Sequence, residues 1–157
     1  MNEFVIKGGV PLAGEVRISG NKNAVLPMIA AAILTDKEII LRNVPDIIDV
    51  RVMLELISLM GVESDFSGGV LRLRAAAIKT TDLPREFCSR IRTSLLFAGP
   101  LLARAGRASM WPPGGDVIGR RRLDGHFYGL KSLGADVRCD ELPFKFELKK
   151  KLKGRDL

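Results

Sequence analysis

The sequence repeats itself, and this repetition limits the folds open to the chain more than any other feature. The segment LISLMG at residues 56–61 is matched by LKSLG at residues 130–134. Around both segments, the spacing of apolar residues predicts a similar succession of helices and short strands. We therefore expect an α/β (α+β) chain of repeated βαβαββ units, about residues 12–75 and 83–150, with helices packed against mixed sheets.

The predicted elements follow from periodicity and from the positions of Gly, Pro and capping residues. Pro100 is expected to kink the long helix of the second unit or to end its regular part. For the first unit we predict strands at 4–6 and 16–18, a helix at 24–34, a strand at 38–42, a helix at 49–60 and a hairpin of 62–66 with 70–74. For the second we predict a helix at 84–104, a strand at 107–111, a helix at 124–133 and a hairpin of 135–139 with 144–148.

The second unit carries an insertion. The offset between the units is 68 residues where Pro45 is matched to Pro113, but 75 where Asp49 is matched to Asp124. The extra residues fall on the loop PGGDVIGRRRLD at 113–124, which holds Asp116 and three consecutive arginines. Such a density of donors suits phosphate or carboxylate, although a solvated basic turn is the alternative. Because the first unit does without this loop, we favour a functional role for it.

Two further stretches carry candidate anion-binding residues. The segment SGNKN at 19–23 precedes an alanine-rich run, which places Lys22 at a predicted helix N-terminus, where free N–H groups and the helix dipole attract anions. An ordinary capped turn with a solvated lysine is the alternative. Arg90 and Arg92 are two residues apart on the helix predicted at 84–104, so they cannot share a face, and spacing does not decide which one faces a ligand.

Composition argues against several classes of function. The net charge of +7 suggests a nucleic-acid binder, but residues 143–157 alone contribute +4, and one Trp and one Tyr leave few aromatic side chains for stacking on bases. Cys88 and Cys139 have neither metal-ligand nor disulfide spacing. The N-terminus does not have the pattern of a signal peptide, and the longest apolar run, 24–34, is too short to cross a bilayer. We expect a soluble cytoplasmic protein that binds no nucleic acid and no membrane.

Three motifs in order resemble the enolpyruvyl transferases: SGNKNA at 19–24, IRTS at 91–94 and PGGDVIGRRRLDGH at 113–126. The resemblance implies part of that family's inside-out α/β barrel, in which six βαβαββ units form two domains. It points to the members that start peptidoglycan synthesis by joining phosphoenolpyruvate to the 3′-hydroxyl of UDP-N-acetylglucosamine, with loss of phosphate. The implied partners are these two substrates and the missing C-terminal repeats, with no cofactor and no metal.

The resemblance also carries roles onto single residues. Lys22 and Asn23 match positions that bind phosphoenolpyruvate and the sugar nucleotide, and Arg92 matches the active-site arginine of the helix. The remaining matches are Arg121, which corresponds to an arginine that contacts both substrates, and Arg122, Leu123 and Asp124, which correspond to the segment beside the uridine. This sequence departs from the family at Leu96, where tryptophan is frequent, and at Arg122, where proline is common.

Asp116 matches the general acid of the family's mobile loop, which is a cysteine in most members. A carboxyl group with its usual pKa of about 3.9 is ionised at neutral pH, so proton donation requires desolvation under a closed loop, against the effect of the neighbouring arginines. The substitution also removes the thiol that fosfomycin alkylates, which predicts resistance. The general base is expected in the missing part; His126 is an alternative, although a histidine one turn into a helix is more often packed or solvated.

Three interpretations stay open on the sequence alone. The first is an N-terminal piece of the carboxyvinyltransferase. The second is a βαβαββ module that binds a phosphorylated ligand or partner without chemistry. The third is a basic nucleic-acid binder, which only the C-terminal tail supports. For a truncated chain we also expect exposed apolar surface, including the strand of Phe144, Phe146 and Leu148, and hence self-association.

Overall fold

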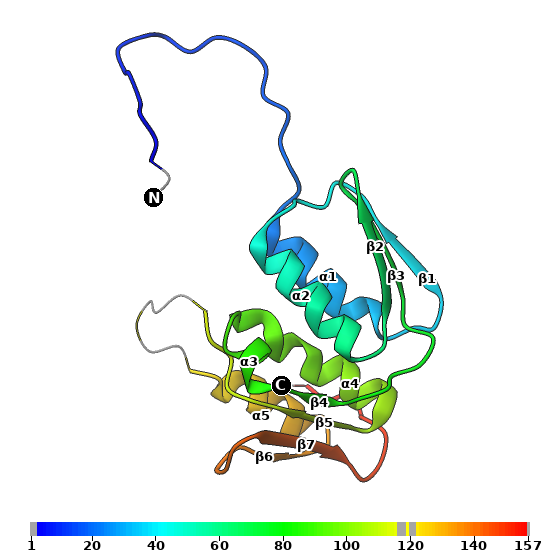
Figure 1. The fold of residues 1–157 in the computed structure, drawn as a ribbon. Helices are drawn as coiled ribbons and strands as arrows, with labels where there is room; N and C mark the ends of the chain where they lie inside the picture. Colours follow the sequence, from blue (N-terminus) through cyan, green and yellow to red (C-terminus); the bar gives the residue numbers. More distant parts are fainter. Residues whose placement is uncertain (1–2, 116–118, 120–121, 157) are drawn as a thin grey trace.

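The computed structural model describes residues 3–115, 119 and 122–156. Two sheets form the outer layers of the body, and helices α1, α2 and α4 lie between them (Figure 1). In the described part of the chain, no helix has the length and apolar character needed to cross a membrane.

The first half of the body is a three-stranded antiparallel sheet covered by two helices. Its strands run in the order β1-β3-β2, with Ile39 opposite Leu73 and Phe66 opposite Leu71. The helix faces that meet the sheet carry the apolar residues that periodicity selected, such as Met53 and Leu56, which are fully buried. The elements are α1 (Lys22–Ala32), β1 (Glu38–Leu41), α2 (Ile48–Leu59), β2 (Glu63–Ser67) and β3 (Val70–Arg74).

The second half is a four-stranded mixed sheet in the order β4-β5-β7-β6. Its β4–β5 pair is parallel, and the other two pairs are antiparallel. The elements are β4 (Asp82–Leu83), α3 (Arg85–Cys88), the 3₁₀-helix η1 (Arg92–Phe97), α4 (Ala98–Ala105), β5 (Arg107–Met110), α5 (Asp124–Ser132), β6 (Ala135–Arg138) and β7 (Phe144–Leu148). The predicted helix at 124–133 and both predicted hairpins are confirmed to within two residues.

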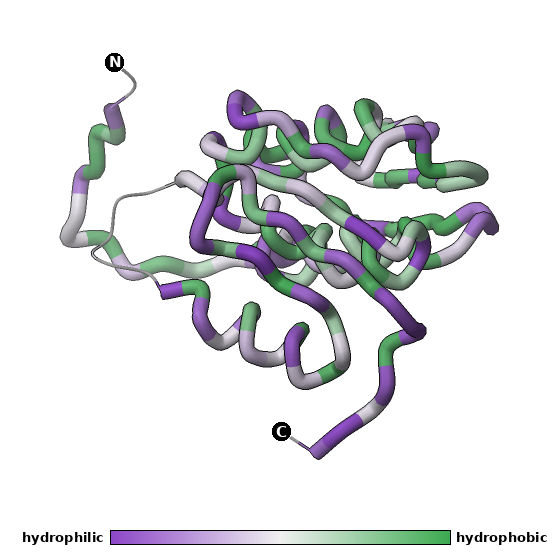
Figure 2. The backbone as a smooth tube through the Cα atoms, turned by 90° about the horizontal axis from the view of Figure 1, so that it is seen from below, coloured by the Kyte–Doolittle hydropathy of each residue, from purple (hydrophilic) through white to green (hydrophobic). Residues whose placement is uncertain are grey.

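The two strands predicted at 4–6 and 16–18 are wrong. Residues 3–20 form no helix or strand and run away from the body (Figures 1 and 2). Phe4, Ile6, Val16 and Ile18 are each more than 80% exposed. Alternation of apolar residues favours a strand only where a sheet edge and an apolar surface receive it, and no described strand pairs with this segment.

The single helix predicted at 84–104 is also wrong, because the chain is extended at Ile91 (φ −140°, ψ 145°). The hydroxyl of Ser94 donates to the carbonyls of Cys88 and Ile91, at 3.3 and 3.0 Å. These bonds offer the backbone an alternative to helix at the break. Pro100 does not end the regular part; it lies in the first turn of α4, where a missing N–H is tolerated.

Strand β7 is not the exposed surface expected for self-association. It lies between β5 and β6, and Phe146 is fully buried while Phe144 is 8% exposed. Phe127 of α5 covers it, with its ring edge-on to Phe144 at 5.2 Å between centroids. The strand is therefore part of the core: it pairs with a strand on each side, and α5 packs on its face.

Strand β4 was not predicted, since two residues are too short to produce a periodic signal. It is fixed by its parallel pairing with β5 and by Ser109, whose N–H donates to the carbonyl of Thr81 at 2.9 Å. The first sheet has no counterpart of β4 among the described residues. There, β1 forms an open edge instead.

Candidate functional site

A hollow of about 720 Å³ lies where the two halves of the body meet. We call it the cationic hollow. Three of its lining residues are basic, and one, Asp49, is acidic. The lining residues come from the starts of α1 and α2, from the segment around η1 and from both ends of the inserted loop: Lys22, Asn23, Leu26, Pro27, Ile48, Asp49, Arg90, Ile91, Arg92, Thr93, Leu95, Leu96, Gly115, Leu123 and His126.

Lys22 and Asn23 are the first two residues of α1. Asn21 caps the helix, with Oδ1 accepting from the N–H of Ala24 at 3.2 Å. The first N–H groups of a helix have no partner within it, so the hollow receives backbone donors as well as the Lys22 ammonium. The helix begins two residues before its predicted start, which places Pro27 in the second turn, where it donates no bond to the carbonyl of Asn23.

Arg90 and Arg92 both line the hollow but have different hydrogen-bond partners. Arg90 makes two hydrogen bonds to the carboxylate of Glu55 on α2, and its guanidinium lies 5.8 Å from the ring centroid of Phe87. The bond to Glu55 raises the pKa of Arg90 further above its usual value. Arg92 instead donates to the carbonyl of Arg122 at 3.2 Å. Among the described residues, Arg92 therefore has no carboxylate partner, unlike Arg90.

The start of the inserted loop is pressed against the segment that carries Arg92. The N–H of Gly114 donates to the carbonyl of Cys88 at 3.0 Å. A Cβ on Gly114 would lie 1.7 Å from the carbonyl oxygen of Ser89, so only glycine fits. Gly115 has a φ of +95°, and a Cβ there would lie 3.3 Å from the N–H nitrogen of Arg92. This close approach fixes the position of the loop start relative to the backbone of Arg92.

The other end of the loop leads into α5. Leu123 is half-buried and lines the hollow, as does the exposed His126 one turn later. Arg122 and Asp124 form an exposed ion pair with each other and are not among the residues that line the hollow. Asp116 and Arg121, the predicted acid and the predicted two-substrate arginine, lie outside the described residues.

The structure thus brings together four of the predicted site residues: Lys22, Asn23, Arg92 and Leu123. Sequence reasoning missed Asp49, whose carboxylate lies 2.8 Å from the ammonium of Lys22, and it missed Glu55 as the partner of Arg90. The sequence did show that Asp49 is an acidic residue in the first turn of a predicted helix. Its pairing with Lys22, however, depends on how α1 and α2 pack.

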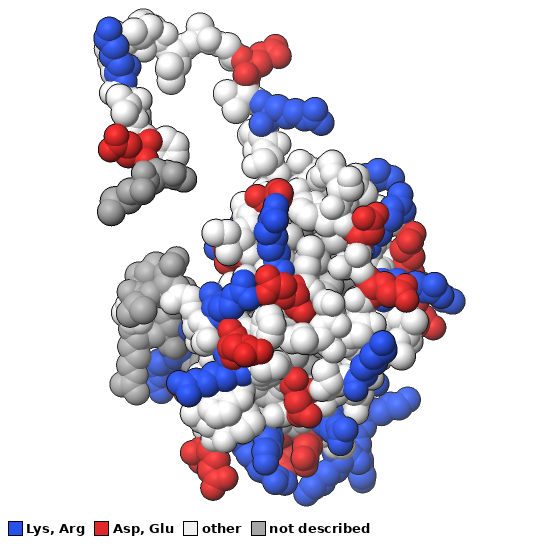
Figure 3. All heavy atoms as spheres, in the orientation of Figure 1, with Lys and Arg blue, Asp and Glu red and all other residues white. Residues whose placement is uncertain are grey.

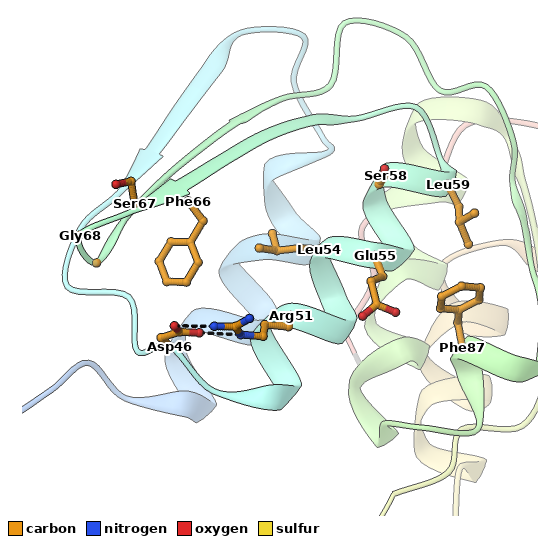
Figure 4. A pocket seen from close by; sticks show the side chains of 11 residues that line it. Asp46, Arg51, Leu54, Glu55, Ser58, Leu59, Phe66, Ser67, Gly68 and Phe87 are labelled. Atoms are coloured by element: carbon orange, nitrogen blue, oxygen red, sulfur yellow. Dashed lines mark hydrogen bonds and ion pairs between the residues drawn. The ribbon is translucent and has the colours of Figure 1, made fainter.

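A larger groove of about 950 Å³ lies beside α2 and β2 (Figure 4). Its apolar part consists of Leu54, Phe66 and Phe87. The charges of Arg51 and Asp46 in this groove are already paired with each other, because Arg51 donates two hydrogen bonds to Asp46 at 2.8 and 2.7 Å. These bonds lower the pKa of the Asp46 carboxyl group. The groove therefore offers an anion less than the cationic hollow does.

Elsewhere on the described surface, positive charge gathers in the C-terminal tail. Figure 3 shows Lys and Arg interspersed with Asp and Glu over the face that it draws. The basic residues of the tail gather with Lys131 at the end of α5, where cations complement the helix dipole. Among the described residues, no group of three or more His, Cys, Asp and Glu could hold a metal ion.

Comparison with known proteins identifies the class to which this fold and site belong. Residues 6–157 match the model of the EPSP synthase (3-phosphoshikimate 1-carboxyvinyltransferase) family. The chain therefore belongs to this family, and the resemblance drawn from the three motifs is confirmed.

Two curated relatives are both UDP-N-acetylglucosamine 1-carboxyvinyltransferases. The protein of Treponema denticola is 50% identical, over 100% of this chain and 37% of its own length. That of Bradyrhizobium diazoefficiens is 46% identical, over 99% of this chain and 36% of its own length. The chain spans little more than a third of the length of these relatives.

Solved structures confirm the predicted fold class. The enolpyruvyl transferase NikO from Streptomyces tendae has a TM-score of 0.75 and 24% identity, over 92% of this chain and 32% of its own. EPSP synthase from Acinetobacter baumannii has a TM-score of 0.68 and 18% identity, over 90% of this chain and 33% of its own. At these identities the likeness concerns the fold alone.

Proposed function

We propose that the chain is the N-terminal part of an enzyme that transfers the enolpyruvyl group of phosphoenolpyruvate to the 3′-hydroxyl of UDP-N-acetylglucosamine and releases phosphate. This reaction would be the first committed step of peptidoglycan synthesis. The names of the relatives that are 46–50% identical favour this substrate over 3-phosphoshikimate, the substrate in the name of the family model.

The observation that carries the proposal is the meeting of Lys22 and Arg92 at one hollow, although they come from opposite halves of the chain. Both substrates are anions, and the reaction needs cationic groups for the phosphate and carboxylate of phosphoenolpyruvate. Two helix-start N–H groups and Asn23 add donors that are not charged. If the two side chains were only solvated surface charges, their meeting at one hollow would not be expected.

We assign the other predicted residues to the same reaction. Asp116 would be the general acid that protonates the methylene carbon, with its pKa raised when the loop closes over substrate. Arg121 would contact both substrates, and Arg122, Leu123 and Asp124 would lie along the uridine. Of this last group, Leu123 lines the hollow, whereas Arg122 and Asp124 would have to exchange their mutual ion pair for contacts with the ligand.

Calorimetric titration with UDP-N-acetylglucosamine, with and without phosphoenolpyruvate, tests the proposal when a phosphate-release assay is run on the same sample. We expect binding without turnover, because the general base and another phosphoenolpyruvate arginine are assigned to the missing repeats. Turnover would place the base within these residues and contradict that assignment. Absence of binding would favour the non-catalytic module.

The proposal includes the remaining repeats of the same family as the natural partner. We propose that residues 12–75 and 83–150 correspond to two of the βαβαββ units, supported by the shared succession of helix, strand, helix and hairpin in the two halves. Among the described residues, the first of these units lacks its opening strand. Exposed apolar side chains at Phe4, Leu12 and Val16 support a partner surface. A second copy of the chain is the other candidate occupant, and sedimentation at two concentrations separates the two cases.

The aspartate at position 116 also leads to a proposal about fosfomycin. A carboxylate lacks the thiol that this antibiotic alkylates, so we propose that a complete enzyme with this loop is resistant. Mass spectrometry after incubation with fosfomycin and the sugar nucleotide tests this. We expect no adduct on the wild type and an adduct on Asp116→Cys; an adduct on the wild-type loop would contradict the proposal.

A further inference from the structure

The three basic side chains of the cationic hollow differ in the groups to which they are bound. Arg90 is held by Glu55, which lies outside the hollow and lines the groove of Figure 4. Arg92 donates to a backbone carbonyl, which carries no full charge. Within the described part of the chain, Lys22 is the one of the three that is paired with a carboxylate lining the hollow, that of Asp49.

The position of Asp49 makes this pairing unusual for an anion site. Asp49 lies in the first turn of α2, where the helix dipole stabilises its negative charge, and its Oδ1 is 2.8 Å from Nζ of Lys22. It is the one carboxylate among the described lining residues. A phosphate that binds the Lys22 ammonium must therefore compete with this carboxylate for it.

We propose that Asp49 is a resident counter-ion for Lys22. An anionic ligand must either displace Asp49 or share the Lys22 ammonium with it. This rests on the proposed function, since it treats the cationic hollow as the site of phosphorylated ligands. A ligand with many other contacts, such as a sugar nucleotide, overcomes the competition. Inorganic phosphate, the product of the proposed reaction, has few other contacts, so Asp49 favours its departure and limits its rebinding.

Titration of the full chain with inorganic phosphate, followed through the amide signals of Lys22 and Asn23, tests the proposal. We expect Asp49→Asn to bind phosphate roughly five-fold more tightly, the size of a partly exposed charge interaction. Asp46→Asn is the matched control, because Asp46 is an exposed carboxylate with its own partner, Arg51, but lines the other groove. Its affinity for phosphate should match that of the wild type.

Lys22→Gln shows whether the effect passes through the lysine. If Asp49 acts as its counter-ion, Lys22→Gln and the double variant Lys22→Gln/Asp49→Asn bind phosphate with the same low affinity, within two-fold. The proposal is overturned if Asp49→Asn binds phosphate no more tightly than the wild type, if neither of the two binds it, or if the gain persists without Lys22. Asp49→Ser, another residue suited to a helix start, replaces Asp49→Asn should that variant misfold.

Titration of the same samples with UDP-N-acetylglucosamine separates this inference from the proposed function. Tighter phosphate binding by Asp49→Asn with no binding of the sugar nucleotide by any variant would support the counter-ion and contradict the proposed function. The reverse pattern, sugar-nucleotide binding without a phosphate effect at Asp49, would contradict the counter-ion alone.

Discussion

Arg90 and Glu55 are joined by two hydrogen bonds between the segment before η1 and the outer face of α2. The pair links the two halves of the body, and the ring of Phe87 lies under the guanidinium at 5.8 Å. Arg90 lines the cationic hollow but is already paired, whereas Arg92, two residues later, has no carboxylate partner among the described residues. The two arginines thus have separate roles, one structural and one for the ligand.

Matched substitutions separate these roles. We expect Arg90→Gln to lower the melting temperature while the affinity for UDP-N-acetylglucosamine falls by less than about three-fold. Arg92→Gln should leave the melting temperature unchanged and weaken binding by more than about ten-fold, the loss of roughly one charge-assisted contact. Thermal denaturation and calorimetry measure the two effects. A larger loss of affinity in Arg90→Gln than in Arg92→Gln would reverse the assignment.

The start of the inserted loop tolerates no side chain at position 114. Gly114→Ala should lower the free energy of unfolding by about 1–3 kcal/mol, because the new Cβ meets the carbonyl of Ser89 and the backbone has to move. Gly125→Ala is the control: its Cβ meets nothing within 4 Å, and alanine in the first turn of α5 should be neutral or stabilising by up to about 1 kcal/mol. Urea unfolding of both variants checks the difference in sign.

The N-terminal segment contributes little to the stability of this chain. Phe146→Ala should cost about 3–5 kcal/mol because the ring is fully buried and packs against Phe127. Phe4→Ala should change the free energy of unfolding by less than about 0.5 kcal/mol, because its side chain is 96% exposed. A cost above 1 kcal/mol for Phe4→Ala would mean that the segment packs on the body in solution.

Cys88 should make stability fall at alkaline pH. Burial raises the pKa of its thiol above the usual 9.0, so the unfolded chain loses this proton at a lower pH than the folded chain does. The contribution is complete below pH 9.0 and is lost as the pH rises through the higher pKa of the folded state. Urea midpoints at pH 7.5 and pH 10 should therefore differ less in Cys88→Ala than in the wild type. Cys139→Ala, which alters a half-buried thiol, should behave as the wild type.

Most of the fold follows from local patterns in the sequence. The apolar spacing of α2, the capping Asn21 of α1 and the glycine turns of the two hairpins are signals that neighbouring residues carry, and these elements are confirmed. The errors occur where contacts with other parts of the structure, or side-chain hydrogen bonds, determine the backbone conformation. Residues 4–18 alternate as a strand does but lack a sheet edge, and Ser94 replaces helical bonds at Ile91 with its own. Neither effect is visible in periodicity.

The site was predictable in part for the same reason. Lys22 was placed at a helix start by its neighbours, and the structure agrees. The choice between Arg90 and Arg92 depended on Glu55, which is thirty-five residues away from Arg90 in the sequence. The role of Asp49 depended on the packing of α1 against α2. Contacts between elements, rather than residue types, supplied what the sequence analysis lacked.

Mapping the binding of UDP-N-acetylglucosamine by amide chemical shifts is the most direct test of the central claim, that the cationic hollow is the ligand site. The account predicts that the largest shifts fall on Lys22 and Asn23 at the start of α1 and on Arg92 and Thr93 at the start of η1, and that they vanish in Arg92→Gln. Shifts centred on the groove of Leu54 and Phe66, or no shifts at saturating ligand, would contradict it.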